Sequence, residues 1–160
     1  MQDLKALFES LRFTQVRTLL NSGNVLFDTA RPNRKKLAAT IASAFEARFG
    51  FSSKVTLITA ETLEAIIAAN PLLESVQDPA RHFVAFAADE TVWVRLKPLA
   101  KQDWRPDALV IGEAAAYLWC LKGALDSPLS KAFGKAAGDA VTLRNWATVL
   151  KIRAAAVPPT

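Results

Sequence analysis

Three residues near the C-terminus have the types and the spacing of a phosphate site. Arg144, Thr148 and Lys151 lie at i, i+4 and i+7 and combine a guanidinium, a hydroxyl and an ammonium group. On a helix they would form one polar stripe. Because a helix N-terminus presents free N–H groups, a guanidinium beside it suits a phosphate. A structural interpretation stays open, in which Arg144 pairs with a carboxylate, Asn145 caps the helix and Trp146 fills the core.

A second candidate ligand site is the turn formed by Asn21, Ser22, Gly23 and Asn24. Small and amide side chains at a hairpin tip can present hydrogen-bond donors to a ligand. The same four residues are also those that a tight turn favours, because Gly and Asn accept a positive φ. Ligand binding and turn formation are therefore both compatible with the sequence.

The charge distribution points to the C-terminal part of the chain. The whole protein has a net charge of +5. Residues 122–160 contain six Lys or Arg and two Asp, so their net charge is +4. A local excess of positive charge attracts polyanions such as nucleic acid, and it also serves to keep a protein soluble.

Nucleophilic, acid–base and metal chemistry have little support. His82, the one histidine, opens an apolar stretch and is expected to be structural. Cys120, the one cysteine, lies in the sequence Leu-Trp-Cys-Leu and is expected to be buried and unreactive. These two residues cannot supply a zinc or iron–sulfur site, and no P-loop, GxGxxG or GxSxG motif occurs. We therefore predict no catalytic residue, no metal and no cofactor.

The elements that must position these residues follow from hydrophobic periodicity and turn signals. Residues 91–101 are ambiguous, because their apolar residues fit both a strand and a helix. The other predicted helices are 4–12, 34–49, 59–70, 129–137 and 145–155. The predicted strands are 16–20, 25–27, 54–59, 82–87, 107–112 and 115–121, with a short extended piece before the last helix.

This order of elements predicts an α+β fold made of two ferredoxin-like, βαββαβ-type subdomains. The first subdomain would span residues 1–78 and lack its first strand. The second would span residues 79–160 and end in the basic C-terminal helix. The two halves resemble each other in element order only, because their residues are too different for a sequence repeat.

Two stretches resemble signature segments of the bacterial domain-of-unknown-function family 1697. They are RTLLNSGNVLF at 17–27 and TLRNWATVLK at 142–151, with weaker similarity at 47–51 and 69–71. The resemblance implies an α+β fold of two subdomains and a helix at 91–101. It implies no activity.

Members of that family usually begin with a strand and a Gly-containing basic turn that this sequence does not contain. The resemblance therefore implies that Met1 corresponds to an internal position of the family, through a misassigned gene start or a natural short form. In a βαββαβ unit the first strand lies in the middle of the sheet, so its neighbours would need another partner. A possible outcome is a homodimer through the exposed sheet of the first subdomain.

The composition limits the class of protein. The chain has 160 residues, of which 51% are hydrophobic, and it has neither an 18-residue apolar run nor a signal peptide. We expect a cytoplasmic protein without a membrane partner that acts as a non-enzymatic binding module for a phosphorylated ligand or nucleic acid. The alternatives are an enzyme of unknown reaction without a metal, and a protein-interaction module if Trp93, Trp104 or Phe133 form an exposed patch.

Overall fold

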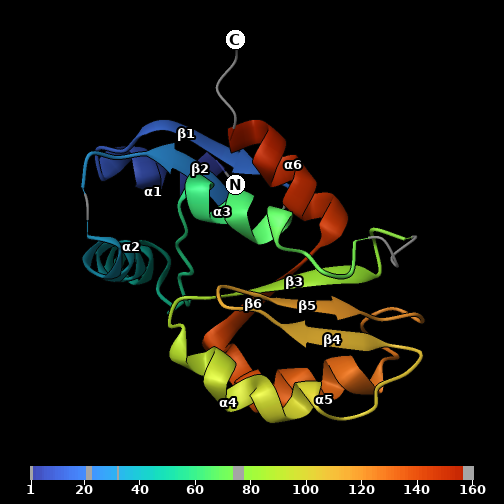
Figure 1. The fold of residues 1–160 in the computed structure, drawn as a ribbon. Coiled ribbons are helices and arrows are strands. Elements are labelled where there is room, and N and C mark those ends of the chain that lie inside the picture. Colours follow the sequence, from blue (N-terminus) through green and yellow to red (C-terminus); the bar gives the residue numbers. More distant parts are fainter. Residues whose placement is uncertain (1, 21–22, 32, 74–77, 157–160) are drawn as a thin grey trace. The chain divides into compact units, whose positions relative to one another are not determined.

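The computed structural model describes residues 2–20, 23–31, 33–73 and 78–156. They divide into two compact units, one formed by Met1–Leu57 with Ala154–Thr160 and the other by Ile58–Arg153. Figure 1 shows the elements of both units. Within the described part of the chain, no helix is both long and apolar enough to cross a membrane.

The N-terminal unit contains two helices and one two-stranded sheet. Its elements are α1 (Gln2–Ser10), β1 (Thr14–Leu19), β2 (Asn24–Asp28) and α2 (Arg34–Phe49). The strands are antiparallel, with Thr18 opposite Val25. The predicted helix at 34–49 is confirmed. Asn33 caps its N-terminus, because Asn33 Oδ1 accepts a hydrogen bond of 3.1 Å from the Lys36 N–H. Gly50 ends the helix with a φ of 81°.

A small aromatic core holds this unit together. Its buried residues are Phe8, Phe13, Val16, Leu37 and Ile41. Half-buried side chains of β2 pack against it, and the Phe13 and Phe27 rings stack with their centroids 4.4 Å apart. The alternation of apolar residues in β2 thus places them on one face of the hairpin.

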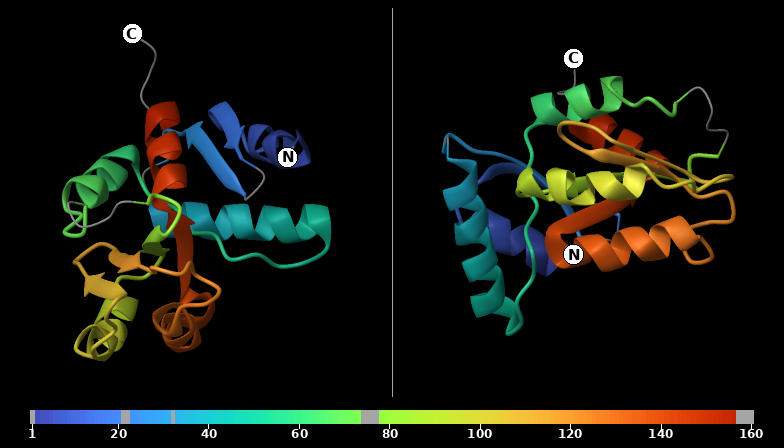
Figure 2. Two further views of the ribbon diagram at one scale, coloured as in Figure 1. Left: turned by 90° about the vertical axis from the view of Figure 1, so that its right-hand side faces the viewer. Right: turned by 60° about the horizontal axis from the view of Figure 1, so that its bottom comes forward.

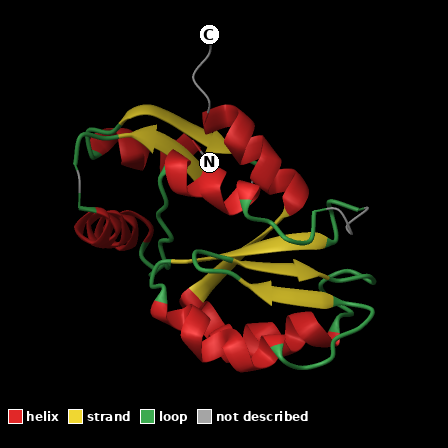
Figure 3. Cartoon of the chain, viewed as in Figure 1, coloured by secondary structure: helices red, strands yellow, loops and turns green. Residues whose placement is uncertain are grey.

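The strand predicted at 54–59 is wrong. The backbone there forms no strand, and Figure 3 draws it as loop. Val55 and Leu57 nevertheless pack against the aromatic core. The alternating pattern therefore reports correctly which side chains are covered, but a strand also needs a hydrogen-bonded neighbour. Among the described residues, β1 and β2 pair only with each other.

The C-terminal unit is built on a four-stranded antiparallel sheet with strand order β4-β5-β3-β6. Its elements are α3 (Ala60–Ala68), β3 (His82–Ala87), α4 (Thr91–Ala100), β4 (Ala108–Ile111), β5 (Ala116–Trp119), α5 (Pro128–Ala137), a 3₁₀ turn (Gly138–Ala140), β6 (Val141–Asn145) and α6 (Trp146–Ala156). From β3 to β6 this is the βαββαβ arrangement predicted for this half. The helix implied at 91–101 is also confirmed.

The sheet buries both of its faces. Neighbouring residues of β3 point to opposite sides, so Ala85 joins a core with α4 and α5, whereas Val84 joins a core with α3 and α6. In Figure 1 these helix pairs lie on opposite faces of the sheet. Because α3 packs against β3, it groups with the C-terminal unit, which begins at Ile58, whereas the sequence predicted a division at residue 78.

Candidate nucleic-acid interface

The predicted stripe of Arg144, Thr148 and Lys151 does not lie on one helix. Arg144 is in β6, opposite Val84 of β3, and only the other two residues are in α6. The i, i+4, i+7 geometry is therefore wrong, because the chain is extended up to Asn145 and turns helical only afterwards. Thr148 is half-buried and Lys151 is exposed.

Arg144 faces the α3 and α6 side of the sheet, since it shares that face with its neighbour Val84. Its Nη1 donates to the Leu143 carbonyl over 2.9 Å. Burial lowers the pKa of the guanidinium. Arg144 is thus a half-buried residue of the edge strand β6, and its guanidinium bonds to the backbone of the preceding residue.

The structural interpretation is confirmed for the two residues that follow. Asn145 caps α6, because its Oδ1 accepts from the Thr148 N–H over 2.9 Å. Trp146 is only 6% exposed and packs in the core between the sheet, α3 and α6. Both positions are therefore explained by folding.

The second candidate site, the turn at residues 21–24, is only partly described. Asn21 and Ser22 lie outside the described residues. Gly23 has a φ of 79°, which favours glycine. Asn24 is 8% exposed and donates from Nδ2 to the Leu19 carbonyl over 3.1 Å. Gly23 thus provides the positive φ that the turn needs, and Asn24 stabilises the hairpin through its bond to Leu19. Both roles agree with the turn interpretation of the sequence.

The two residues with potential for acid–base or nucleophilic chemistry are buried. His82 is fully buried between hydrogen-bonding partners from the protein. Cys120 is 1% exposed, and burial raises the pKa of its thiol above the usual value. Both positions agree with the predicted structural roles.

The basic residues of the C-terminal part fall on both sides of the sheet. Lys131 and Lys135 lie on α5, whereas Lys151 and Arg153 lie on α6. Arg153 also forms an ion pair with Glu64 of α3, with 3.7 Å between Nε and Oε1. The +4 charge of residues 122–160 is therefore not one patch, because the topology separates the two helices.

A different group of basic residues is carried by α4, by the residue that follows it and by α5, which share one core, and we name this group the α4–α5 basic face. It consists of the exposed residues Arg95, Lys97, Lys101, Lys131 and Lys135. Neither helix contains an Asp or a Glu. Within the described part of the chain, none of the five forms an ion pair. Positive charge on this face is thus uncompensated along both helices.

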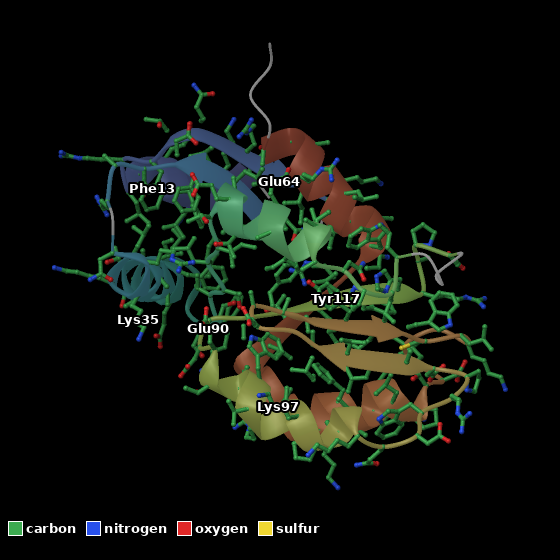
Figure 4. The ribbon with its side chains drawn as sticks, in the orientation of Figure 1. Phe13, Lys35, Glu64, Glu90, Lys97 and Tyr117 are labelled. Atoms are coloured by element: carbon green, nitrogen blue, oxygen red, sulfur yellow. The ribbon has the colours of Figure 1, made fainter. Side chains whose placement is uncertain are left out.

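Packing against the sheet explains why these side chains point outward. The helix α4 buries Val92, Trp93 and Leu96, and α5 buries an equivalent stripe from Leu129 to Ala137. The helices lie side by side on one face of the sheet (Figures 1 and 2). Figure 4 shows Lys97 on this side and Tyr117 on the other. The residues opposite each buried stripe are left to solvent.

The nearest other cation is neutralised locally. Arg105 follows α4 and donates from Nε and Nη2 to the two oxygens of Asp103, over 2.9 and 2.6 Å. These bonds lower the pKa of Asp103 to about 2. The charges of Arg105 and Asp103 are therefore paired with each other, and Arg105 does not add a free cation to the α4–α5 basic face.

Sequence reasoning missed the contribution of α4. Arg95, Lys97 and Lys101 lie in the segment 91–101, whose periodicity by itself fits both a strand and a helix, so the pattern of residues assigned no face to them. A helical assignment alone would have placed Lys97 and Lys101 on one side, four residues apart. Only the topology, however, brings α4 onto the same core as α5, the helix that carries Lys131 and Lys135.

Comparisons with known proteins agree with this fold. The structure is similar to that of the conserved bacterial protein SP0830 from Streptococcus pneumoniae, with a TM-score of 0.79 and 20% identity over 98% of this chain and 88% of that one. At this identity the likeness concerns the fold alone. No curated protein matches the chain significantly. A family model described as "Protein of unknown function (DUF1697)" matches residues 1–117, a range that contains the signature segment at 17–27 and ends before the one at 142–151. The chain therefore belongs to the DUF1697 family.

Proposed function

We propose that this protein is a cytoplasmic, non-enzymatic module that binds nucleic acid through the α4–α5 basic face. The observation that carries the proposal is a set of five exposed cations, four on α4 and α5 and one directly after α4, none of which forms an ion pair with another described residue. Cations on such a face gain free energy from phosphate groups, because binding releases the counterions that surround a nucleic acid. Their arrangement on one surface also steers a polyanion to that surface.

The shape of the face favours an extended ligand over a small phosphorylated molecule. Small ligands are usually enclosed in concave sites. The cations of α4 and α5 are spread along two helices, so an extended polyanion can contact several of them at once. The alternative phosphate site at Arg144 has less support, because Arg144 lies on a strand and Lys151 on a helix.

The other two functional classes have less support as well. A protein-interaction module would be favoured if Trp93, Trp104 or Phe133 formed an exposed patch, but Trp93 is 3% exposed and Phe133 is fully buried. An enzyme needs a reactive group that substrate can reach, whereas His82 and Cys120 are buried. These observations favour a binding function.

The test compares two variants with the same loss of charge. Lys131→Gln with Lys135→Gln removes two cations of the face, and Lys35→Gln with Lys36→Gln removes two exposed cations of α2. Affinity for a fluorescent oligonucleotide is measured by anisotropy at several salt concentrations. We expect the face variant to reduce the slope of log affinity against log salt by about two.

The α2 variant is the control for net charge. It should leave the salt slope and the affinity close to those of the unmodified protein. Equal losses in both variants would contradict a localised interface and leave only a general attraction between a basic protein and a polyanion. Thermal melts establish that both variants are folded.

A further inference from the structure

We infer that the α4–α5 basic face takes double-helical nucleic acid and contacts the phosphates of both strands without reading the bases. This inference rests on the proposed function and specifies its ligand. Three properties of the face support it: the arrangement of its lysines in two rows, the burial of its aromatic residues and its width.

The lysines form one row along each helix, and Lys101 of the first row is the residue directly after the end of α4. Lys97 and Lys101 are four residues apart, and so are Lys131 and Lys135. A separation of four residues is about 6 Å along a helix. This matches roughly two base-pair steps of 3.4 Å along a duplex strand. By this axial spacing, each row can contact alternate phosphates of one strand.

The two rows belong to helices that pack against each other and share one core. Packed helices have axes about 8–10 Å apart. The grooves of B-form DNA are about 6 and 12 Å wide, so two rows at this spacing can contact phosphates on both sides of a groove. A single strand offers one line of phosphates and would engage one row at a time.

The aromatic residues of both helices point into the core. Trp93 of α4 is 3% exposed, and Phe133 of α5 is fully buried. Proteins that bind single strands without sequence preference generally stack bases on exposed aromatic side chains. Neither helix offers such a platform, so its cations gain more from a duplex with two phosphate backbones.

The width of the face argues against base recognition. One helix with its side chains is about 10–12 Å across, and a pair is wider than the major groove of about 12 Å. Neither helix can therefore enter the groove while the two lie side by side. Neither contains Asn or Gln, and Lys131 and Lys135 act on phosphate as point charges.

The experiment measures anisotropy of a fluorescein-labelled DNA duplex of about 20 base pairs, a second duplex of unrelated sequence, and each separated strand. We expect the two duplexes to bind equally, within about twofold, and each single strand to bind at least about fivefold more weakly. Two row variants are compared, Lys97→Gln with Lys101→Gln and Lys131→Gln with Lys135→Gln. Each should lower the salt slope on duplex by about two, and their combination by about four.

The outcomes separate this inference from the proposed function. Equal or tighter binding of single strands, or a duplex affinity that depends on only one row, would overturn the two-strand geometry and keep nucleic-acid binding. A strong preference between the two duplexes would overturn binding without base reading. Absence of binding to every oligonucleotide at low salt would overturn the proposed function itself. Binding to vesicles of anionic lipid in place of oligonucleotides would do the same.

Discussion

Asn70 donates from Nδ2 to Nε2 of the fully buried His82 across 2.7 Å. The other ring nitrogen, Nδ1, donates to the Leu118 carbonyl over 3.0 Å. Asn70 Oδ1 accepts from the Leu72 N–H over 2.9 Å, which fixes the orientation of the amide. The imidazole is therefore neutral, with its proton on Nδ1, and it connects β3 to β5 and to the segment after α3.

Stability should depend on pH through His82. Burial lowers its pKa below the usual 6.5, and the bond to Leu118 opposes this shift only in part. The unfolded chain then binds a proton at higher pH than the folded one. The contribution of His82 to the free energy of unfolding is therefore fully present above about pH 6.5. It is lost as pH decreases toward the lowered pKa. Urea unfolding followed by tryptophan fluorescence between about pH 5.5 and 8 measures it.

His82→Gln is the control for this dependence, because the chain has one histidine. The variant should be less stable at neutral pH, since it loses part of the bridge between Asn70 and Leu118. Its unfolding free energy should change much less between about pH 5.5 and 6.5. An unchanged pH dependence in the variant would show that titratable groups other than His82 cause the loss of stability at low pH.

Trp146 should be an anchor of α6. Its side chain is 6% exposed and packs among Leu63, Ile67 and Val149. Its backbone N–H donates to the Pro79 carbonyl over 3.1 Å. Trp146→Ala should cost about 3–5 kcal/mol, because it opens a cavity in this core. Denaturant unfolding measures the loss. A melting temperature near that of the unmodified protein, combined with lost oligonucleotide binding, would instead make Trp146 a stacking residue.

Trp93 should tolerate replacement by Phe unusually well. Its indole N–H is buried and has no hydrogen-bond partner among the described residues. An unsatisfied buried donor costs about 1–3 kcal/mol, so Trp93→Phe removes a cost together with some packing. The indole N–H of the less buried Trp104 donates to the Leu99 carbonyl over 2.6 Å. Trp104→Phe should therefore destabilise more, and the reverse order in urea unfolding would refute this account.

Ser127 should contribute more than a helix cap. Its Oγ donates to Asp107 Oδ2 over 2.7 Å and accepts from the Ser130 N–H over 3.0 Å, and both Ser127 and Asp107 are buried. Ser127→Ala should cost about 2–3 kcal/mol, because it removes the cap of α5 and leaves a buried carboxylate oxygen without a donor. The exposed cap Thr59 accepts from the Thr62 N–H in the same way. Thr59→Ala should cost only about 1 kcal/mol, and equal costs would show that the carboxylate contributes nothing.

Local sequence signals predicted the elements well and their partners poorly. The helix α2 could be placed because Asn33 and Gly50 are typical of its two ends. The segment 54–59 was predicted as a strand because burial of Val55 and Leu57 produces the same alternation, whatever the backbone pairs with. The half-buried strand β6 has no clear alternation, so the position of Arg144 on it could not be predicted.

The candidate interface depends on topology more than on any motif. The charge count drew attention to residues 122–160, but α5 and α6 cover opposite faces of the sheet. Which helices share a face is decided by strand order and by the connections between strands, which no local pattern contains. The predicted βαββαβ order does place both of its helices on one face. Combined with the helix that the family resemblance implies at 91–101, this order places α4, which carries Lys97, on the same face as α5, which carries Lys131.

The sheet of the N-terminal unit should allow self-association. Among the described residues, β2 pairs only with β1, and a two-stranded sheet is marginally stable by itself. An edge with unpaired backbone groups is a template for another strand, so we expect a second copy of the chain to pair there. Light scattering over a range of concentrations should detect a dimer.

Leu26→Lys, which adds charge to β2, should raise the dissociation constant of this dimer by at least about tenfold. Ala39→Lys adds the same charge to the exposed side of α2 and should change it little. A protein that stays monomeric at every concentration would refute pairing at this edge and leave the nucleic-acid interface unaffected.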